Sequence, residues 1–184
     1  MKKICLFLAA LILLTSGAFA ATTTEKWAAG WSNLHEPLNY TKSKVQWSVA
    51  STKLTVSFTL AGATPNKLYE VGIEIFCTTT PATFGQFPIA TPAGGGTCPT
   101  QTQQGTTKSY AWAALGVVTT DIHGNGVFKV VVGPIAAGTY NAELFALDGA
   151  GCGLIGGAGN GSDCNVDFQS PGPTWGDGIT FTIP

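Results

Sequence analysis

Apolar and polar residues alternate with a period of two through most of this chain. Residues 45–49 alternate in this way, and after a turn at Ser51-Thr52 the alternation resumes over residues 54–60. Successive side chains of a β-strand point to opposite faces, so the pattern predicts a hairpin of two strands, each with one buried face. A second turn at residues 64–67, built on Pro and Asn, predicts the end of the second strand.

The next predicted strand, residues 69–77, is apolar on one face and carries two acids on the other. Glu70 and Glu74 alternate there with Val, Ile and Cys residues. Acidic side chains are rarely buried and are ordinary on the wet side of a half-buried strand. We therefore expect both carboxylates to face water.

The same alternation continues toward the C-terminus. Residues 109–120 predict another strand pair or one bent strand, and Asp121–Gly126 contains an Asn-Gly pair that favours a tight hairpin turn. Residues 127–132 then run back along the hairpin. Further strands are predicted over residues 140–147 and 179–183.

About eight short strands at this spacing predict an all-β fold, a single antiparallel β-sandwich of the immunoglobulin-like or Greek-key type. The strand phases predict that Lys53 faces water. They also predict a set of buried side chains: Val56, Phe58, Ile73, Ile75, Val130, Leu144 and Phe181.

The segment from Thr119 to Phe128, followed by Ala137-Gly138-Thr139-Tyr140, resembles hairpins of secreted bacterial immunoglobulin-like sandwich modules. This resemblance implies a sandwich fold and no particular activity. Residues 115–121 also resemble part of a copper-zinc superoxide dismutase sandwich. That family carries paired histidine ligands where this chain has Val71-Gly72-Ile73-Glu74, so dismutase chemistry is not implied.

The N-terminus has the three parts of a secretory signal peptide. Two lysines precede an apolar run from Ile4 to Leu14, and Ala18-Phe19-Ala20 supplies the small residues of a cleavage site. The run is shorter than the roughly 20 residues that span a bilayer. We predict that residues 1–20 form a signal helix that is cleaved, and that residues 21–184 fold outside the cell or in the periplasm without a transmembrane anchor.

Charge is scarce. Only 10% of the residues are charged, and removal of the signal peptide leaves seven lysines against ten acids, a net charge of −3. The chain contains no arginine, the residue whose planar fork binds phosphate and guanine edges. We therefore expect no nucleic-acid partner and a surface made largely of Ser, Thr, Gly, Asn and Gln.

Four cysteines remain after cleavage, and an even number in an oxidising compartment favours disulfides. Three pairings are possible. We favour Cys77–Cys98 and Cys152–Cys164, because each pair brackets a Gly-rich stretch within the predicted loops 78–107 and 149–176. A structural zinc site is the weaker alternative, since the chain has no Cys-x-x-Cys and only two histidines.

No constellation of residues predicts catalysis. His35 and His123 lie in irregular or turn segments without a nucleophile motif. Catalysis by paired carboxylates stays open through Glu70, Glu74 and Glu143, although exposed acids such as Glu70 and Glu74 are ordinary on the polar side of a strand. We predict a protein that is not an enzyme, with no catalytic residue and no cofactor.

Calcium is the one metal ion for which the sequence offers a candidate loop, although no metal site is predicted outright. Calcium prefers oxygen ligands, and a Gly-rich loop near the C-terminus concentrates them without the order of an EF-hand. The candidate ligands are Asn160, Asp163, Asn165 and Asp167.

Large apolar residues in the two long loops suggest a contact surface, because loops are normally polar. If each strand reverses direction, loops 78–107 and 149–176 start at one end of the sandwich and form one patch. Its predicted binding residues are Phe84, Phe87, Leu154, Ile155 and Trp175. With few lysines and no arginine, binding by this patch should depend little on salt.

These observations favour a secreted, non-enzymatic β-sandwich that binds or adheres through its end loops to an extracellular protein or polysaccharide. The alternative is a structural subunit of an extracellular fibre or coat. It would self-associate through sheet edges, for which the segment Thr22–Tyr40 looks unpaired. A carbohydrate-active or other secreted enzyme is the third possibility.

Overall fold

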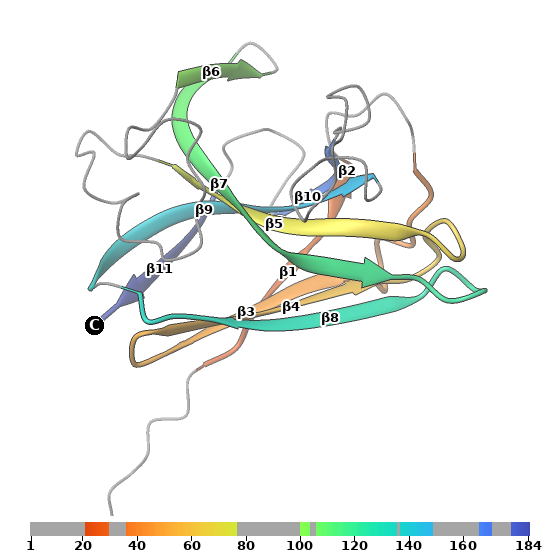
Figure 1. Ribbon diagram of the computed structural model, residues 1–184, viewed down its shortest axis with the longest axis horizontal. Helices are drawn as coiled ribbons and strands as arrows, with labels where there is room; N and C mark the ends of the chain where they lie inside the picture. The colour runs from red at the N-terminus through yellow and green to blue at the C-terminus, as the bar shows by residue number, and fades with distance from the viewer. Residues whose placement is uncertain are drawn as a thin grey trace, which may run out of the picture.

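The computed structural model describes residues 21–29, 36–76, 100–103, 106–135, 137–148, 166–170 and 178–184. Within these ranges the chain forms eleven β-strands (Figure 1) and contains no helix long and apolar enough to cross a membrane. The strands are β1 (Thr23–Lys26), β2 (Ala28–Ala29), β3 (Lys44–Ala50), β4 (Lys53–Leu60), β5 (Leu68–Phe76), β6 (Thr100–Gln103), β7 (Thr106–Thr119), β8 (Gly126–Val132), β9 (Gly138–Asp148), β10 (Val166–Ser170) and β11 (Ile179–Ile183).

The strands form two antiparallel sheets that face each other as the layers of a sandwich (Figure 1). The four-stranded sheet has the order β1-β3-β4-β8. The seven-stranded sheet has the order β2-β10-β9-β5-β7-β6, and β11 also pairs with β9. The predicted all-β antiparallel sandwich is therefore confirmed, with more strands than the eight expected. The predicted signal peptide lies outside the described residues, so export stays a prediction.

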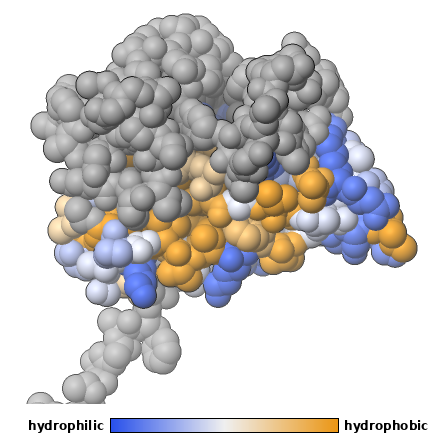
Figure 2. Space-filling model, viewed as in Figure 1, coloured by the Kyte–Doolittle hydropathy of each residue, from blue (hydrophilic) through white to orange (hydrophobic). Residues whose placement is uncertain are grey.

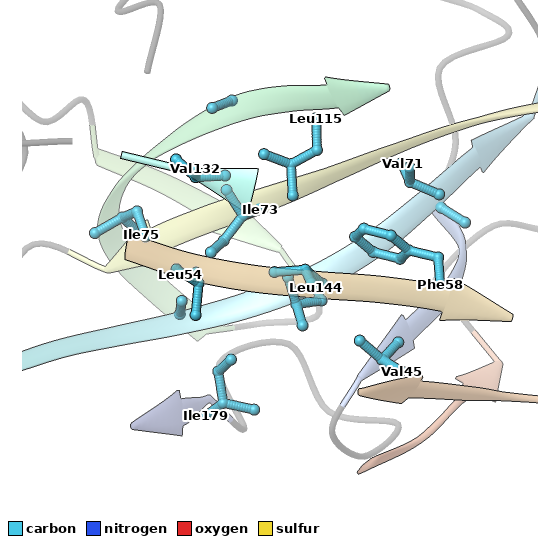
Figure 3. Close-up of a cluster of buried hydrophobic side chains, with 14 of the residues drawn as sticks. Val45, Leu54, Phe58, Val71, Ile73, Ile75, Leu115, Val132, Leu144 and Ile179 are labelled. Atoms are coloured by element: carbon cyan, nitrogen blue, oxygen red, sulfur yellow. The ribbon is translucent and has the colours of Figure 1, made fainter. Parts of the chain in front are cut away.

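The hydrophobic core lies between the two sheets, where side chains from both layers interdigitate (Figure 3). Phe58 and Ile73, from opposite sheets, are both fully buried. Six of the seven side chains predicted to be buried are buried, while Val130 is half-buried at the rim. Lys53 is exposed, as predicted. The apolar phase of each strand therefore identified the inner faces correctly.

The turn Asp121–Gly126 does not close a hairpin, which corrects the sequence prediction. β7 before it pairs with β5 and β6, whereas β8 after it pairs with β4 in the other sheet. The positive φ of 76° lies at Gly124, whose backbone packs so closely on Ala63 that a Cβ would collide with it. This turn therefore carries the chain from one layer to the other.

The N-terminal segment is not an unpaired strand, which corrects a second expectation. β1 pairs with β3 in the four-stranded sheet, and β2 pairs with β10 in the seven-stranded sheet. Between them Trp27 is buried, stacks on Phe58 with ring centroids 6.0 Å apart, and donates a hydrogen bond from Nε1 to the Thr59 carbonyl oxygen at 3.1 Å. The strands β1 and β2 of this segment are therefore already paired within the same molecule.

The prediction that Glu70 and Glu74 face water is wrong. Glu70 is 1% exposed and Glu74 is 6% exposed. Apolar residues share this outer face of the seven-stranded sheet, and the Phe145 ring lies so close to Gly72 that a Cβ there would be 2.3 Å from it. A sheet that is covered on both sides buries both phases of its strands, so the polar phase alone does not identify a wet face.

The predicted common end of the two long loops is also wrong. β5 and β9 run antiparallel, with Phe76 opposite Asn141 and Tyr69 opposite Asp148. The last residues of β5 and β9 therefore lie at opposite ends of the sheet. The expectation failed because residues 109–119 belong to one strand, β7, and not to a pair of strands. The chain therefore reverses direction three times from β5 through β7 and β8 to β9, and β9 runs antiparallel to β5.

Candidate functional site

The sequence-predicted site residues lie almost entirely outside the described residues. This holds for Phe84, Phe87, Leu154, Ile155 and Trp175, for the cysteines Cys77, Cys98, Cys152 and Cys164, and for Asn160, Asp163 and Asn165 of the calcium loop. Asp167 belongs to strand β10. Their binding, disulfide and calcium roles stay predictions. His123 is exposed in its turn, as expected.

The described surface that is best built for contact is the outer side of the four-stranded sheet, which we call the open face. It consists of the polar phase of four neighbouring strands, with cross-strand partners in register: Thr24, Lys26, Lys44, Gln46, Ser48, Lys53, Thr55, Ser57, Thr59, Val127, Lys129 and Val131. All of these residues are half-buried or exposed.

The centre of the open face is a shallow depression with a volume of about 170 Å³. Its lining contains four hydroxyl side chains, one amide and one amine, and all of the lining residues except Thr22 lie on the adjacent strands β3, β4 and β8. The lining residues are Thr22, Gln46, Trp47, Ser48, Thr55, Ser57 and Lys129. Such groups can each donate hydrogen bonds to the oxygens of a polar ligand.

The backbone beneath this depression is held by the core. Along β4 the residues between the open-face side chains, Leu54, Val56 and Phe58, are fully buried. Gln46 Nε2 donates a hydrogen bond of 3.2 Å to Thr24 Oγ1, which orients the amide along the face. A sheet packed on one side thus presents its hydroxyl groups from a fixed framework.

An apolar edge borders the open face. β8 is an edge strand of the four-stranded sheet, and Val127 and Val131 are 70% and 56% exposed. Figure 2 shows hydrophobic surface, interrupted by hydrophilic residues, along the side of the molecule where β8 runs. Lys129 lies between the two valines on the same face of the strand.

A polar cluster joins the two layers at one end of the sandwich. Glu36 forms an ion pair with Lys67 and accepts hydrogen bonds from Thr64 Oγ1 at 2.6 Å and from the Tyr69 hydroxyl at 2.9 Å. Burial raises the pKa of the Glu36 carboxyl, but these hydrogen bonds outweigh burial and hold that pKa below its usual range. Burial raises the pKa of Tyr69 to about 12. The groups are already engaged with one another, so the cluster serves as a structural clamp.

The three buried acids of the opposite sheet form a second polar group. Glu74 and Glu143 are direct cross-strand neighbours, and Glu70 lies on the same face of β5. Within the described ranges, however, no three His, Cys, Asp or Glu residues are arranged to hold a metal ion. The sequence singled out these three acids, but its pattern predicted Glu70 and Glu74 to be exposed on the polar side of their strand.

Comparison with known proteins adds nothing to what the fold and the described residues show. No protein-family model matches the chain, and no curated protein matches it. A solved structure described as "pH-induced modulation of Streptococcus parasanguinis adhesion by Fap1 fimbriae" is similar at 11% identity, covers 90% of this chain and 99% of that chain, and has a TM-score of 0.35. A likeness of this size supports no conclusion about activity.

Proposed function

We propose that this protein is a secreted, non-enzymatic β-sandwich that acts as a binding or adhesion module. The observation that carries the proposal is the depression on the open face, where hydroxyl, amide and amine groups from three strands converge on a rigid sheet. Surfaces of this kind recognise ligands through several hydrogen bonds made from a fixed scaffold. The predicted end loops would add a second contact region.

A polysaccharide is the ligand class that best suits this surface. Its hydroxyl groups donate and accept hydrogen bonds, as do the Ser and Thr hydroxyls and the Gln46 amide that line the depression. The ligand would lie across the strands, since the polar side chains follow cross-strand rows such as Gln46, Ser57 and Lys129.

The test is binding of the purified protein to immobilised neutral and acidic polysaccharides, measured by biolayer interferometry. Ser57→Trp places a large ring in the depression and should weaken binding about tenfold or more, because interactions at the centre of an interface dominate its affinity. Thr119→Trp is the matched control, because Thr119 is an exposed strand residue of the other sheet. Equal loss in both variants, or no loss in Ser57→Trp, would contradict the proposed surface.

The second candidate function is a structural subunit that assembles through a sheet edge. The observation in its favour is the exposure of Val127 and Val131 on edge strand β8. Lys129 between them opposes this function, since a lysine at an edge discourages pairing with another strand.

Assembly is tested by light scattering over a range of protein concentrations. A subunit of a polymer should grow in mass with concentration, and Val131→Lys should abolish that growth while Thr182→Lys on β11 should not. A monomer at every concentration would remove this candidate.

A further inference from the structure

We propose that the open face binds an acidic polysaccharide through a set of four lysines. The inference rests on the proposed function, since it names the ligand class of the same face. The protein as a whole is expected to carry a net charge of −3 after cleavage, yet four of its seven remaining lysines lie on this one face. These are Lys26, Lys44, Lys53 and Lys129.

The strand register fixes how these lysines are spread. Lys26 and Lys44 are cross-strand neighbours at one corner, Lys129 lies on the opposite edge strand, and Lys53 lies at the far end of β4. With strands about 4.8 Å apart and same-face residues about 6.8 Å apart along a strand, the lysines surround an area of roughly 15 Å by 20 Å. The hydroxyl-lined depression lies inside this area.

No acid balances these charges on the open face. None of its positions is Asp or Glu, and Glu25 of β1 belongs to the other phase of its strand, opposite Val45. In the described part of the chain the four lysines form no ion pair. Three buried acids lie instead on the outer side of the other sheet. Lys26 and Lys44 are cross-strand neighbours within one Debye length, about 8 to 10 Å, so they produce a combined positive potential. Lys129 and Lys53 lie farther away and would each contact a different charge along a polymer that crosses the face.

The chemistry of the face favours an acidic polysaccharide over other polyanions. Nucleic-acid binding uses arginine forks and exposed aromatic stacking platforms, and the chain has no arginine. The aromatic residue that lines the depression, Trp47, belongs to the core-facing phase of β3 and packs against Phe181. A membrane surface would be met by a broad apolar patch, whereas only Val127 and Val131 are apolar here. An acidic polysaccharide matches both features present, because carboxylates suit the lysines and sugar hydroxyls suit Ser, Thr and Gln.

The experiment measures binding of the purified full chain to polygalacturonate, with neutral dextran, duplex DNA and phosphatidylglycerol vesicles as separate arms. We expect binding to polygalacturonate that weakens as NaCl rises from 50 to 500 mM. Lys129→Glu should raise the Kd about tenfold at low salt, with a smaller effect at high salt, because salt screens the lost attraction. Lys44→Glu should reproduce this result.

Lys42→Glu is the matched control. Lys42 is an exposed turn residue outside the open face, so the variant makes the same change in net charge at another place. We expect its Kd to change less than twofold. The circular dichroism spectrum and the melting temperature of Lys129→Glu and of Lys42→Glu should match those of the wild type, because both side chains are exposed.

Four results would overturn the inference. Equal weakening by Lys129→Glu and Lys42→Glu would show that only net charge matters. Binding to DNA or vesicles as tight as to polygalacturonate would replace the polysaccharide with another polyanion. Salt-independent binding to dextran that Ser57→Trp abolishes would leave the proposed function standing and remove the acidic ligand. Absence of binding in every arm would overturn both.

Discussion

The outer faces of the two sheets differ although their strands show the same alternation. On β4 the polar phase carries Thr55 and Ser57 and is partly open to solvent, whereas on β5 the polar phase carries Glu70 and Glu74 and is buried. Alternation of apolar and polar residues therefore identifies the side of a strand that faces the core. It does not determine whether the other side is exposed to solvent.

The difference extends to charge. The solvent-facing sheet surface collects lysines, and the covered surface collects glutamates. Charges are costly to bury, so we expect the covered sheet to tolerate change poorly and the open face to tolerate it well. Two substitution pairs examine this contrast and a third tests the Glu36 clamp, beginning with the largest expected effect.

The first pair compares the two sides of β4 itself. Phe58 is fully buried, so Phe58→Ala should lower the free energy of unfolding by about 3–5 kcal/mol through lost burial and a cavity. Ser57→Ala, one residue earlier and on the open face, should change it by less than about 0.5 kcal/mol. Urea unfolding measures both. A similar cost for the two variants would mean that the open face is packed against something.

The second pair compares the outer faces of the two sheets. Gly72→Ala on β5 places a Cβ 2.3 Å from the Phe145 ring and 2.7 Å from the Ala113 carbonyl oxygen. Overpacking of this kind should cost about 1–3 kcal/mol, although Gly→Ala in a strand is otherwise stabilising. Ser48→Ala on the open face is the control and should be nearly neutral. A stabilised Gly72→Ala would contradict the burial of the β5 outer face.

The third test concerns the clamp that joins the layers. Glu36→Gln removes a charge that Lys67, Thr64 and Tyr69 contact, and should cost about 1–2 kcal/mol at pH 7. The folded pKa of Glu36 lies below the unfolded value of about 4.3, so its contribution is complete above pH 4.3 and is lost as the pH falls through the folded pKa.

The stability difference between wild type and Glu36→Gln should therefore shrink between pH 5 and pH 3 in thermal melts. Glu25→Gln on β1 is the control, because Glu25 is half-exposed and makes no ion pair in the described part of the chain. A difference that stays constant over this pH range would show that the clamp does not depend on the carboxylate.

The sequence alone determined the strands and their inner faces. A period of two is a local property, and Val56, Ile73 and Phe181 are buried because each lies in the apolar phase of its own strand. The turns at Ser51-Thr52 and around Asn66 were also predictable. Ser51 and Asn66 have a φ of 53°, a conformation for which asparagine in particular is suited.

Tertiary structure decided the properties that depend on residues far apart in the chain. Strand pairing turned the segment after Asp121 into a crossing between sheets, and packing on a second face buried Glu70 and Glu74. Composition alone suggested that the few lysines would contribute little to binding. Their gathering on the open face required the register of β1, β3, β4 and β8, because lysines as far apart in the sequence as Lys26 and Lys129 can meet one ligand only when strand pairing places them on the same face.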